Sequence, residues 1–168
     1  MTAHLTFDGY RPGALAATIA LHMAYYAPTW GFGAAFESAL AREMGDFMAR
    51  LDPARDLFLT AYDRENHLVG TITVDGENAT DDGARVRWFV VSEAARGHGL
   101  GKRLMAEAIH FLHARDYPRA YLTTFEGLDT ARTLYERNGF RLVEGGAATA
   151  WSGDVRSQRF EWSGRPRP

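Results

Sequence analysis

The chain has 168 residues, of which 46% are apolar and 24% charged, a composition typical of a globular domain. Its formal net charge of −2 argues against nucleic-acid binding through a general attraction to phosphates. The absence of cysteine excludes disulfides, thiolate catalysis and cysteine-based zinc sites, and it is compatible with the reducing cytoplasm in which we expect the protein. We expect a single domain over residues 1–168, with no signal peptide and no membrane span.

The first half of the chain predicts two amphipathic helices followed by two strands. An apolar series at helical spacing predicts a helix over about residues 13–27 that stops before Pro28. Its members are Leu15, Ile19, Met23 and Tyr26. A second series predicts a helix that ends at Asp52-Pro53. This series consists of Phe36, Leu40, Met44, Met48 and Leu51. Two alternating apolar segments, 57–62 and 67–74, predict strands.

The second half predicts alternating strands and helices. The apolar run Trp88–Val91 is expected to be a buried strand, and Leu100–Leu112 an amphipathic helix. A strand over 119–125 precedes a short helix, and two strands follow at 140–144 and 155–162. With a strand ahead of the first helix, the element order is β-α-α-β-β-β-α-β-α-β-β, which predicts an α/β (mixed α+β) fold with helices on both faces of a mixed sheet.

Residues at both ends of the short helix predict how it starts and how it ends. Asp129 or Thr130 can cap its start, because either side chain can accept hydrogen bonds from the first backbone N–H groups. Gly139 can end the helix in the left-handed conformation, so that Phe140 folds back on Leu134.

Three glycines stand between the Trp88–Val91 strand and the following helix, in the sequence Arg96-Gly97-His98-Gly99-Leu100-Gly101-Lys102. Glycines at a helix start leave backbone N–H groups uncovered at the positive end of the helix dipole, which favours a phosphate or pyrophosphate. A Walker A loop is excluded because Arg103 stands where Ser or Thr is needed. A dinucleotide fingerprint is excluded because Lys102 replaces its third glycine. An ordinary strand–helix connection remains the alternative for this loop alone.

A second motif lies about thirty residues downstream, where the chain reads Ala131-x-x-Leu134-Tyr135-x-x-x-Gly139-Phe140. Together with Arg-x-x-Gly-x-Gly at 96–101, it resembles the GNAT superfamily of N-acetyltransferases, and the resemblance is specific over roughly 84–145. The flanks, His22–Phe36 and Gln158–Glu161, are similar to the acetyltransferase halves of bacterial fusions with a MarR-type regulator. The chain departs from many family members at Leu128, where an Asn is common.

The resemblance implies a fold, a co-substrate and its binding residues. It implies a mostly antiparallel, twisted sheet of about seven strands and an acyl-CoA co-substrate held between the strands that end at Val91 and Thr124. Pantetheine would pair with the strand and the pyrophosphate with the loop. The residues expected to bind acetyl-CoA are Phe89, Val90, Val91, Arg96, Gly97, His98, Gly99, Leu100, Gly101, Lys102 and Tyr135.

The implied reaction is direct transfer of an acetyl group from acetyl-CoA to a primary amine in a ternary complex. Tyr135 matches the family's tyrosine that protonates the departing thiolate, and a phenol suits this role because its ordinary pKa is about 10. Three residues can be considered as the general base. They are Glu126, placed slightly ahead, His22 and Glu37, and an ordered water is an equal alternative. A non-catalytic acyl-CoA-binding or sensing module is the alternative function.

The acceptor site is expected in the aromatic cluster around the connection between the first two helices. Its candidate residues are Tyr26, Trp30, Phe32 and Phe36, with the glycine-flanked Trp30–Gly33 segment as the preferred wall. The histidines form no convincing metal set, so no metal is expected. The expected partner is a small-molecule or peptide amine, with a homodimer left open and neither nucleic acid nor a membrane expected.

Overall fold

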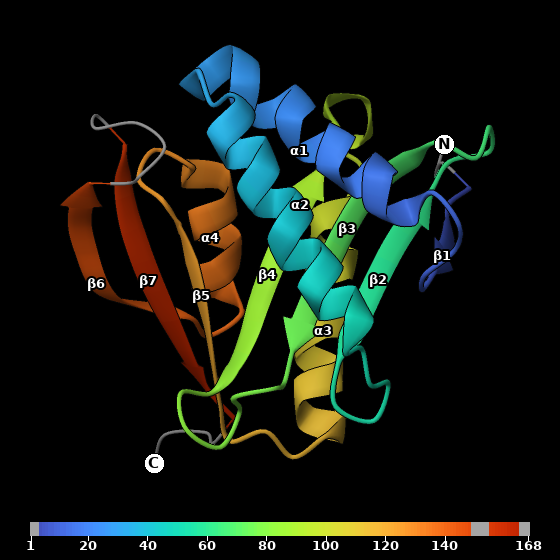
Figure 1. Cartoon of the computed structure of the whole chain (residues 1–168). Helices are drawn as coiled ribbons and strands as arrows, with labels where there is room; N and C mark the ends of the chain where they lie inside the picture. Colours follow the sequence, from blue (N-terminus) through green and yellow to red (C-terminus); the bar gives the residue numbers. More distant parts are fainter. Residues whose placement is uncertain (1–3, 149–154, 165–168) are drawn as a thin grey trace.

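The computed structural model describes residues 4–148 and 155–164, and in this part of the chain seven strands form one sheet (Figure 1). The strands are β1 (Thr6–Asp8), β2 (Leu57–Tyr62), β3 (Leu68–Asp75), β4 (Ala84–Val91), β5 (Arg119–Phe125), β6 (Arg141–Ala148) and β7 (Arg156–Ser163). The helices are α1 (Ala14–Trp30), α2 (Ala34–Ala49), α3 (Leu100–Ala114) and α4 (Asp129–Arg137), with a short 3-10 helix, η1, at Glu93–Ala95. This element order is the predicted one.

The sheet order is β1-β2-β3-β4-β5-β7-β6, and every neighbouring pair is antiparallel except β4 and β5. β4 and β5 pair only at Ala84 with Ala120 and at Arg85 with Tyr121. Beyond these pairs the two strands separate, as Figure 1 shows from the lower end of the sheet upward. Residues 86–91 of β4 therefore have no described strand as a partner on the β5 side.

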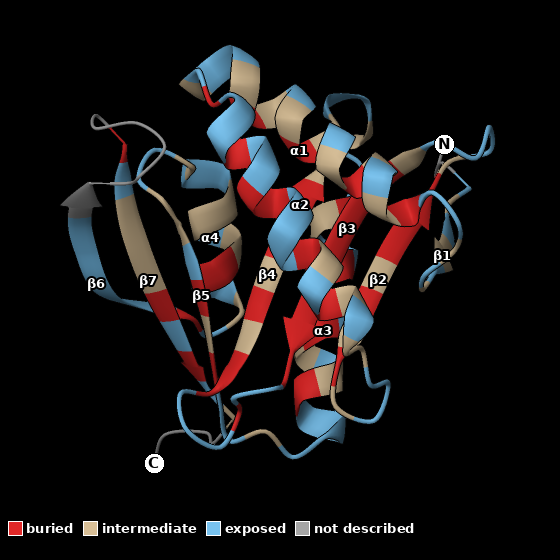
Figure 2. Ribbon diagram, viewed as in Figure 1, coloured by how far each residue is buried: buried red, intermediate tan, exposed pale blue. Residues whose placement is uncertain are grey.

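Helices cover both faces of the sheet, as predicted. One apolar cluster joins α3 and α4 to the sheet through Leu104, Met105 and Tyr135, and a second joins α1 and α2 through Tyr26, Met44 and Phe47. Figure 2 shows the buried residues concentrated on β2, β3, β4 and the inward sides of the helices, whereas β6 is exposed. No helix in the described residues is both long and apolar enough to cross a lipid bilayer.

The first helix differs from its predicted form in two ways. It continues through Pro28 to Trp30 and ends at Gly31, whose φ is 68°. Pro28 has no N–H to donate to the backbone oxygen of Ala24, so the helix continues past it with one hydrogen bond fewer. The predicted apolar stripe is also displaced: the buried residues of α1 are Ala14, Thr18, His22 and Tyr26. Small and polar side chains are thus the ones that lie closest to the sheet. The predicted Leu15, Ile19 and Met23 lie beside them and are only partly buried.

The fourth helix also differs from its predicted start. Its N-cap is Leu128, with no side-chain cap, so neither Asp129 nor Thr130 serves in that role. At the other end Gly139 adopts the predicted left-handed conformation, with a φ of 91°. Phe140 then donates its backbone N–H to the oxygen of Tyr135 and packs against the Tyr135 ring.

A bulge interrupts β4 at Trp88. The β3–β4 register shifts between the Thr71–Val90 and Thr73–Arg87 pairs, and Trp88 has a φ of 51°. A bulky residue with positive φ is strained, and such strain persists where the surrounding structure holds it in place. Trp88 is held by its burial and by the edge of Phe47, 5.4 Å away between ring centroids. The bulge lies in the part of β4 that has already separated from β5, and a bulge bends the strand that carries it.

Candidate active site

Two cavities lie where β4 and β5 separate. The larger, which we call the loop cavity, has a volume of about 610 Å³ and is bounded by β4, the loop 95–102, α4 and Tyr25 and Tyr26 of α1. The smaller, which we call the sheet cavity, has a volume of about 320 Å³ and lies among α1, α2, β4 and β5. Both volumes are in the range of small-molecule sites.

The glycine loop forms one end of the loop cavity. Gly97 and Gly99 have φ angles of 77° and 80°, and a Cβ on either would meet open space. Backbone conformation therefore explains these two glycines. Neither φ nor space demands a glycine at 101, because a Cβ there would make ordinary contacts with Phe89 at 3.5 Å and with Leu134 at 3.7 Å. A larger side chain there would enter the space beside the cavity wall.

The charges around the loop cavity are all positive. Arg96, Lys102 and Arg137 line it, and among the described residues no Asp or Glu does. The guanidinium of Arg96 lies over the Tyr25 ring, 4.5 Å from its centroid, so that α1 helps to position it. Three cations next to the N-terminus of the 15-residue α3 suit a ligand with several phosphate charges. Of the predicted loop residues, only His98 does not line the cavity.

The β4 wall of the loop cavity consists of Phe89, Val90 and Val91, as predicted. These residues lie beyond the last β4–β5 pair, so backbone groups on that side of β4 are not used by a neighbouring strand. An extended ligand with amide groups could pair with them in place of β5.

Three aromatic residues line both cavities: Tyr26, Phe89 and Tyr135. They mark the junction between the two. Burial raises the pKa of Tyr135, and the negative charge of an ionised Tyr25 would raise it further, whereas a hydrogen bond from Thr124 opposes the shift. Burial also raises the pKa of Tyr26. Both phenols are therefore protonated over the whole range from acid to moderately alkaline pH.

His22 lies on α1 and lines the sheet cavity, stacked on Tyr26 with 6.2 Å between ring centroids. Its Nδ1 lies 2.8 Å from the backbone oxygen of Thr18. Because a carbonyl oxygen can only accept, Nδ1 carries the proton and Nε2 of the neutral ring is left as a proton acceptor. Burial lowers the pKa of His22 to about 4, against the opposing effect of the Thr18 hydrogen bond. The ring is neutral at pH 7.

The other end of the sheet cavity is charged. Glu43 of α2 and two arginines of β4, Arg85 and Arg87, line it together with Thr123 and Thr124 of β5. Arg87 forms an ion pair with Glu43 and lies over the Trp88 ring, 4.0 Å from its centroid. Arg85 donates a hydrogen bond to Oγ1 of Thr123 over 3.2 Å.

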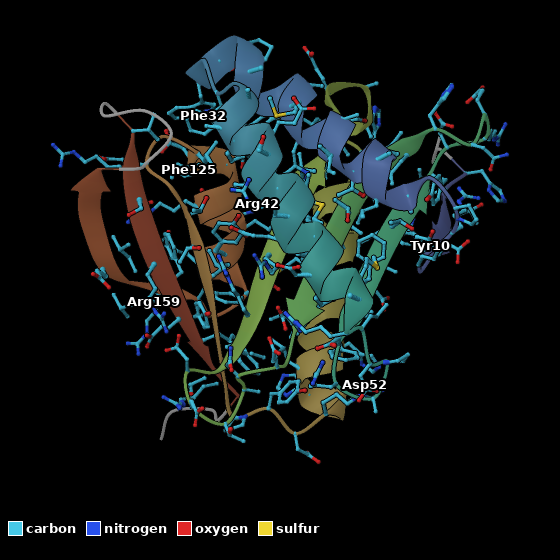
Figure 3. All side chains as sticks on the ribbon, viewed as in Figure 1. Tyr10, Phe32, Arg42, Asp52, Phe125 and Arg159 are labelled. Carbon is cyan, nitrogen blue, oxygen red and sulfur yellow. The ribbon has the colours of Figure 1, made fainter. Side chains whose placement is uncertain are left out.

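Several predicted residues lie outside both cavities. Trp30 and Phe32 pack together with 6.5 Å between ring centroids, and Trp30 also covers Gly127. Phe32 is buried against Phe125, and Figure 3 shows the two side chains beside each other near α4. Of the four residues expected in the acceptor wall, Tyr26 and Phe36 line the sheet cavity, whereas Trp30 and Phe32 belong to the apolar cluster beside it.

The two carboxylates considered as general bases also lie outside the cavities. Glu126 is exposed, and its backbone N–H donates to the oxygen of Arg156. Glu37 is exposed in the first turn of α2. Of the three predicted candidates, only His22 reaches a cavity.

Sequence reasoning missed four charged residues of the site: Glu43, Arg85 and Arg87 in the sheet cavity, and Arg137 in the loop cavity. Arg137 could have been found, because it lies seven residues after Thr130 on one face of a helix. Arg85 and Arg87 alternate with the apolar Val86 and Trp88, which indicates that one face of the strand is polar. Nothing in the sequence showed that α2 would bring Glu43 to that face.

Among the described residues, one group has the geometry to hold a metal ion: Asp63, Glu65 and His67. It lies in the turn between β2 and β3 and lines neither cavity. The Asp63 carboxylate already accepts backbone N–H bonds from Glu65 and His67, so the group explains the turn.

A profile of the Acetyltransferase (GNAT) family matches residues 15–140. Among solved structures, an acetyltransferase of the GNAT family from Staphylococcus aureus Mu50 is 17% identical, with a TM-score of 0.74 and coverage of 95% of this chain and 99% of that one. A GCN5-related N-acetyltransferase from Kribbella flavida is 16% identical, with a TM-score of 0.73 and coverage of 95% and 97%. An acetyltransferase from Streptococcus agalactiae 2603 is 19% identical, with a TM-score of 0.71 and coverage of 95% and 98%. No curated protein matches the chain.

Proposed function

The chain belongs to the Acetyltransferase (GNAT) family, and from this premise we propose that it transfers an acetyl group from acetyl-CoA directly to a primary amine. The observation that carries the proposal is the junction of the two cavities at Tyr26, Phe89 and Tyr135. A donor in the loop cavity and an acceptor in the sheet cavity would meet there without a covalent enzyme intermediate.

The loop cavity fits acetyl-CoA by its charge and shape. Its pyrophosphate would lie against the N–H groups of Gly97–Gly101 and near Arg96, Lys102 and Arg137. Its pantetheine amides would pair with the free side of β4 at Phe89–Val91, which brings the thioester to the junction. Leu128, where many family members have Asn, would offer the pantetheine an apolar contact.

The chemical step joins the amine nitrogen to the thioester carbon and breaks the carbon–sulfur bond. The nitrogen becomes positively charged as the bond forms, and its proton passes to a base. His22 suits this role because its Nε2 is unprotonated, fixed in orientation by Thr18, and beside the junction. The low pKa of His22, about 4, means that the ring releases the proton again readily.

The departing thiolate needs a proton, and Tyr135 suits this role because burial keeps its phenol protonated. Burial also makes the phenolate unstable, so it would take up a proton as soon as one is available. Transfer of the proton held by His22 to the Tyr135 phenolate is downhill, since the pKa of the donor is lowered and that of the acceptor raised. Overall, one proton moves from nitrogen to sulfur and both residues return to their starting states.

The test is turnover of acetyl-CoA with a panel of primary amines, measured as released thiol with a thiol-specific dye. The protein has no cysteine, so every thiol detected comes from CoA. Mass spectrometry of the amine should show the added acetyl group. Tight binding of acetyl-CoA without turnover of any amine would favour a non-catalytic acyl-CoA-binding or sensing module.

A further inference from the structure

We propose that the acceptor amine carries an oxyanion, such as a carboxylate, which Arg85 binds at the far end of the sheet cavity. The inference rests on the proposed function in one respect, since it names the class of acceptor. The binding of the oxyanion itself requires only the sheet cavity.

The charge of Arg87, the neighbouring arginine of β4, is already neutralised. It forms ion pairs with Glu43 and with Asp75, the latter over 3.4 Å. Asp75 in turn accepts two hydrogen bonds from Arg50, over 3.0 and 2.7 Å. Glu43 and Asp75 therefore already pair with arginines other than Arg85, although Asp75 is opposite Arg85 in the β3–β4 pairing.

Arg85 differs from its neighbour because its only hydrogen bond in the described residues goes to a neutral group, Oγ1 of Thr123. It forms no ion pair in the same part of the structure, and its Nε is buried without a hydrogen-bond partner. The charge of Arg85 is close enough to lower the pKa of Arg87, for which burial is the larger cause. A guanidinium with free donors, beside a second guanidinium and on a cavity wall, suits an oxyanion that can accept two hydrogen bonds.

Arg85 is placed to bind the far end of a ligand whose amine lies at the junction of the two cavities. Arg85 is the last β4 residue that pairs with β5, so it lies at the closed end of the gap. Phe89, at the junction of the two cavities, is four residues further along β4, which corresponds to at most roughly 13 Å between Cα atoms because the bulge at Trp88 shortens the path. An acceptor would span the sheet cavity with its amine at Tyr135 and Phe89 and its oxyanion toward Arg85.

The first experiment compares matched acceptors in the acetyl-transfer assay. The set consists of ω-amino carboxylates from glycine to 6-aminohexanoate, the amides of the same acids, and 3-aminopropylphosphonate. The amides match the carboxylates in size but lack the charge. We expect a kcat/KM at least 10-fold higher for the best carboxylate or phosphonate than for its neutral counterpart. The chain length of the best acceptor should indicate the distance between the positions of the amine and the oxyanion. Equal rates for every charged and neutral pair would overturn the proposal and leave the transferase activity intact.

The second experiment removes the guanidinium. Arg85→Met should lower kcat/KM for the preferred anionic acceptor by about 10- to 100-fold, mainly through KM, and should lower it much less for the neutral counterpart. Arg85→Lys should recover part of the loss, because the charge returns without the forked geometry. The control is Arg64→Met, which removes the same charge from the exposed turn between β2 and β3. An equal loss in the control would mean that net charge, not a site, sets the preference.

A binding measurement separates this proposal from the proposed function. Calorimetry of the CoA-bound protein with the ω-amino carboxylates and their N-acetyl derivatives should show binding that Arg85→Met removes. If such binding occurs but no amine is acetylated, the oxyanion site stands and the transferase proposal fails. If neither carboxylate nor phosphonate binds, the oxyanion site is refuted whatever the turnover. Unchanged acetyl-CoA affinity in Arg85→Met would show that the variant is folded, since Arg85 does not line the loop cavity.

Discussion

The Nδ1 atom of His22 lies 2.8 Å from the backbone oxygen of Thr18, one turn earlier in α1. This contact fixes the neutral tautomer of a histidine that is 3% exposed. Protonation would put a charge into that buried position, which is why burial lowers the pKa to about 4.

His22 should make the protein sensitive to mild acid. Its pKa is about 4 in the folded protein against about 6.5 in an unfolded chain, so the unfolded state binds the proton first. The free energy of unfolding should therefore fall as the pH falls from 6.5 to 4, by about 3 kcal/mol in total. Urea unfolding at a series of pH values should show this slope, and His22→Gln should remove it. His67→Gln, in the exposed β2–β3 turn, should keep it.

Loss of the Tyr135 hydroxyl should affect chemistry more than binding. Tyr135→Phe keeps the ring that packs on Phe140 and Phe160, so acetyl-CoA affinity and stability should change little. The kcat should fall by roughly 10²–10⁴ if the phenol protonates the thiolate. Because burial raises the pKa of Tyr135, no limb of the pH–rate profile below about pH 10 should belong to it. Tyr10→Phe, on the surface, is the control, and an equal kcat in both variants would leave Tyr135 as a packing residue.

Substitution of the loop glycines Gly97 and Gly101 should impair the protein for different reasons. Gly97→Ala places a side chain at a φ of 77°, which costs about 1–2 kcal/mol of stability or distorts the loop. Gly101→Val brings methyl groups toward Phe89 and Leu134 without such strain, so it should weaken acetyl-CoA binding at least 10-fold and leave the fold cooperative. Gly45→Ala, in open space on α2, should preserve affinity and raise stability by about 0.5–1 kcal/mol. Calorimetric titration with acetyl-CoA measures the affinity of all three variants. Unchanged affinity in Gly101→Val would contradict the assignment of the loop to acetyl-CoA binding.

Two aromatic substitutions should separate the acceptor wall from the packing beside it. Phe36 lines the sheet cavity, so Phe36→Leu should raise the acceptor KM more than the acetyl-CoA KM. Trp30 lines neither cavity and packs on Phe32 and Gly127, so Trp30→Ala should lower stability by about 2–4 kcal/mol with little change in either KM. Steady-state kinetics with each substrate varied, together with thermal unfolding, test both expectations. If Trp30→Ala selectively raised the acceptor KM, Trp30 would be part of the acceptor wall.

The Asp75 carboxylate should support the charged end of the sheet cavity. Its burial raises the pKa, but hydrogen bonds and charges from Arg50 and Arg87 lower it by more, so the net pKa is below the ordinary value. Asp75→Asn should cost about 2–3 kcal/mol at pH 7, because Arg50 and Arg87 each lose one of their two carboxylate partners at a site that is partly open to water.

The same substitution makes a prediction about pH. Since the folded pKa of Asp75 is lower than the unfolded one, its stabilising effect is present above about pH 4 and is lost as the pH falls further. The difference in unfolding free energy between wild type and Asp75→Asn should thus shrink toward pH 3. Asp46→Asn, exposed on α2, should differ little from wild type at either pH.

Most of the fold and of the loop cavity could be predicted from the sequence because their signals are local. Strand and helix periodicity gave the element order, and two short motifs located the walls from Phe89 to Lys102 and at Tyr135. His98 was the exception in the loop. It lies between two glycines, and nothing in the sequence shows which way a side chain in such a loop points.

The sheet cavity was harder to predict because it depends on which faces of distant elements meet. Large apolar residues suggested that Leu15, Ile19 and Met23 would face the sheet, but the closest approach belongs to Ala14, Thr18 and His22. The aromatic residues Trp30 and Phe32 looked accessible beside their glycines, yet they fill the space over Gly127 and Phe125. Helix rotation and strand separation decide these contacts, and both are tertiary properties.

The separation of β4 and β5 has a consequence for the order in which products leave. The loop cavity is lined by α4 and the loop 95–102, and the sheet cavity is lined by α2 and β5. Free CoA would leave from the loop cavity and the acetylated amine from the sheet cavity, so each product would occupy only the cavity of its own substrate. Such an arrangement predicts product inhibition of a particular form: CoA should compete with acetyl-CoA alone, and the acetylated product with the amine alone.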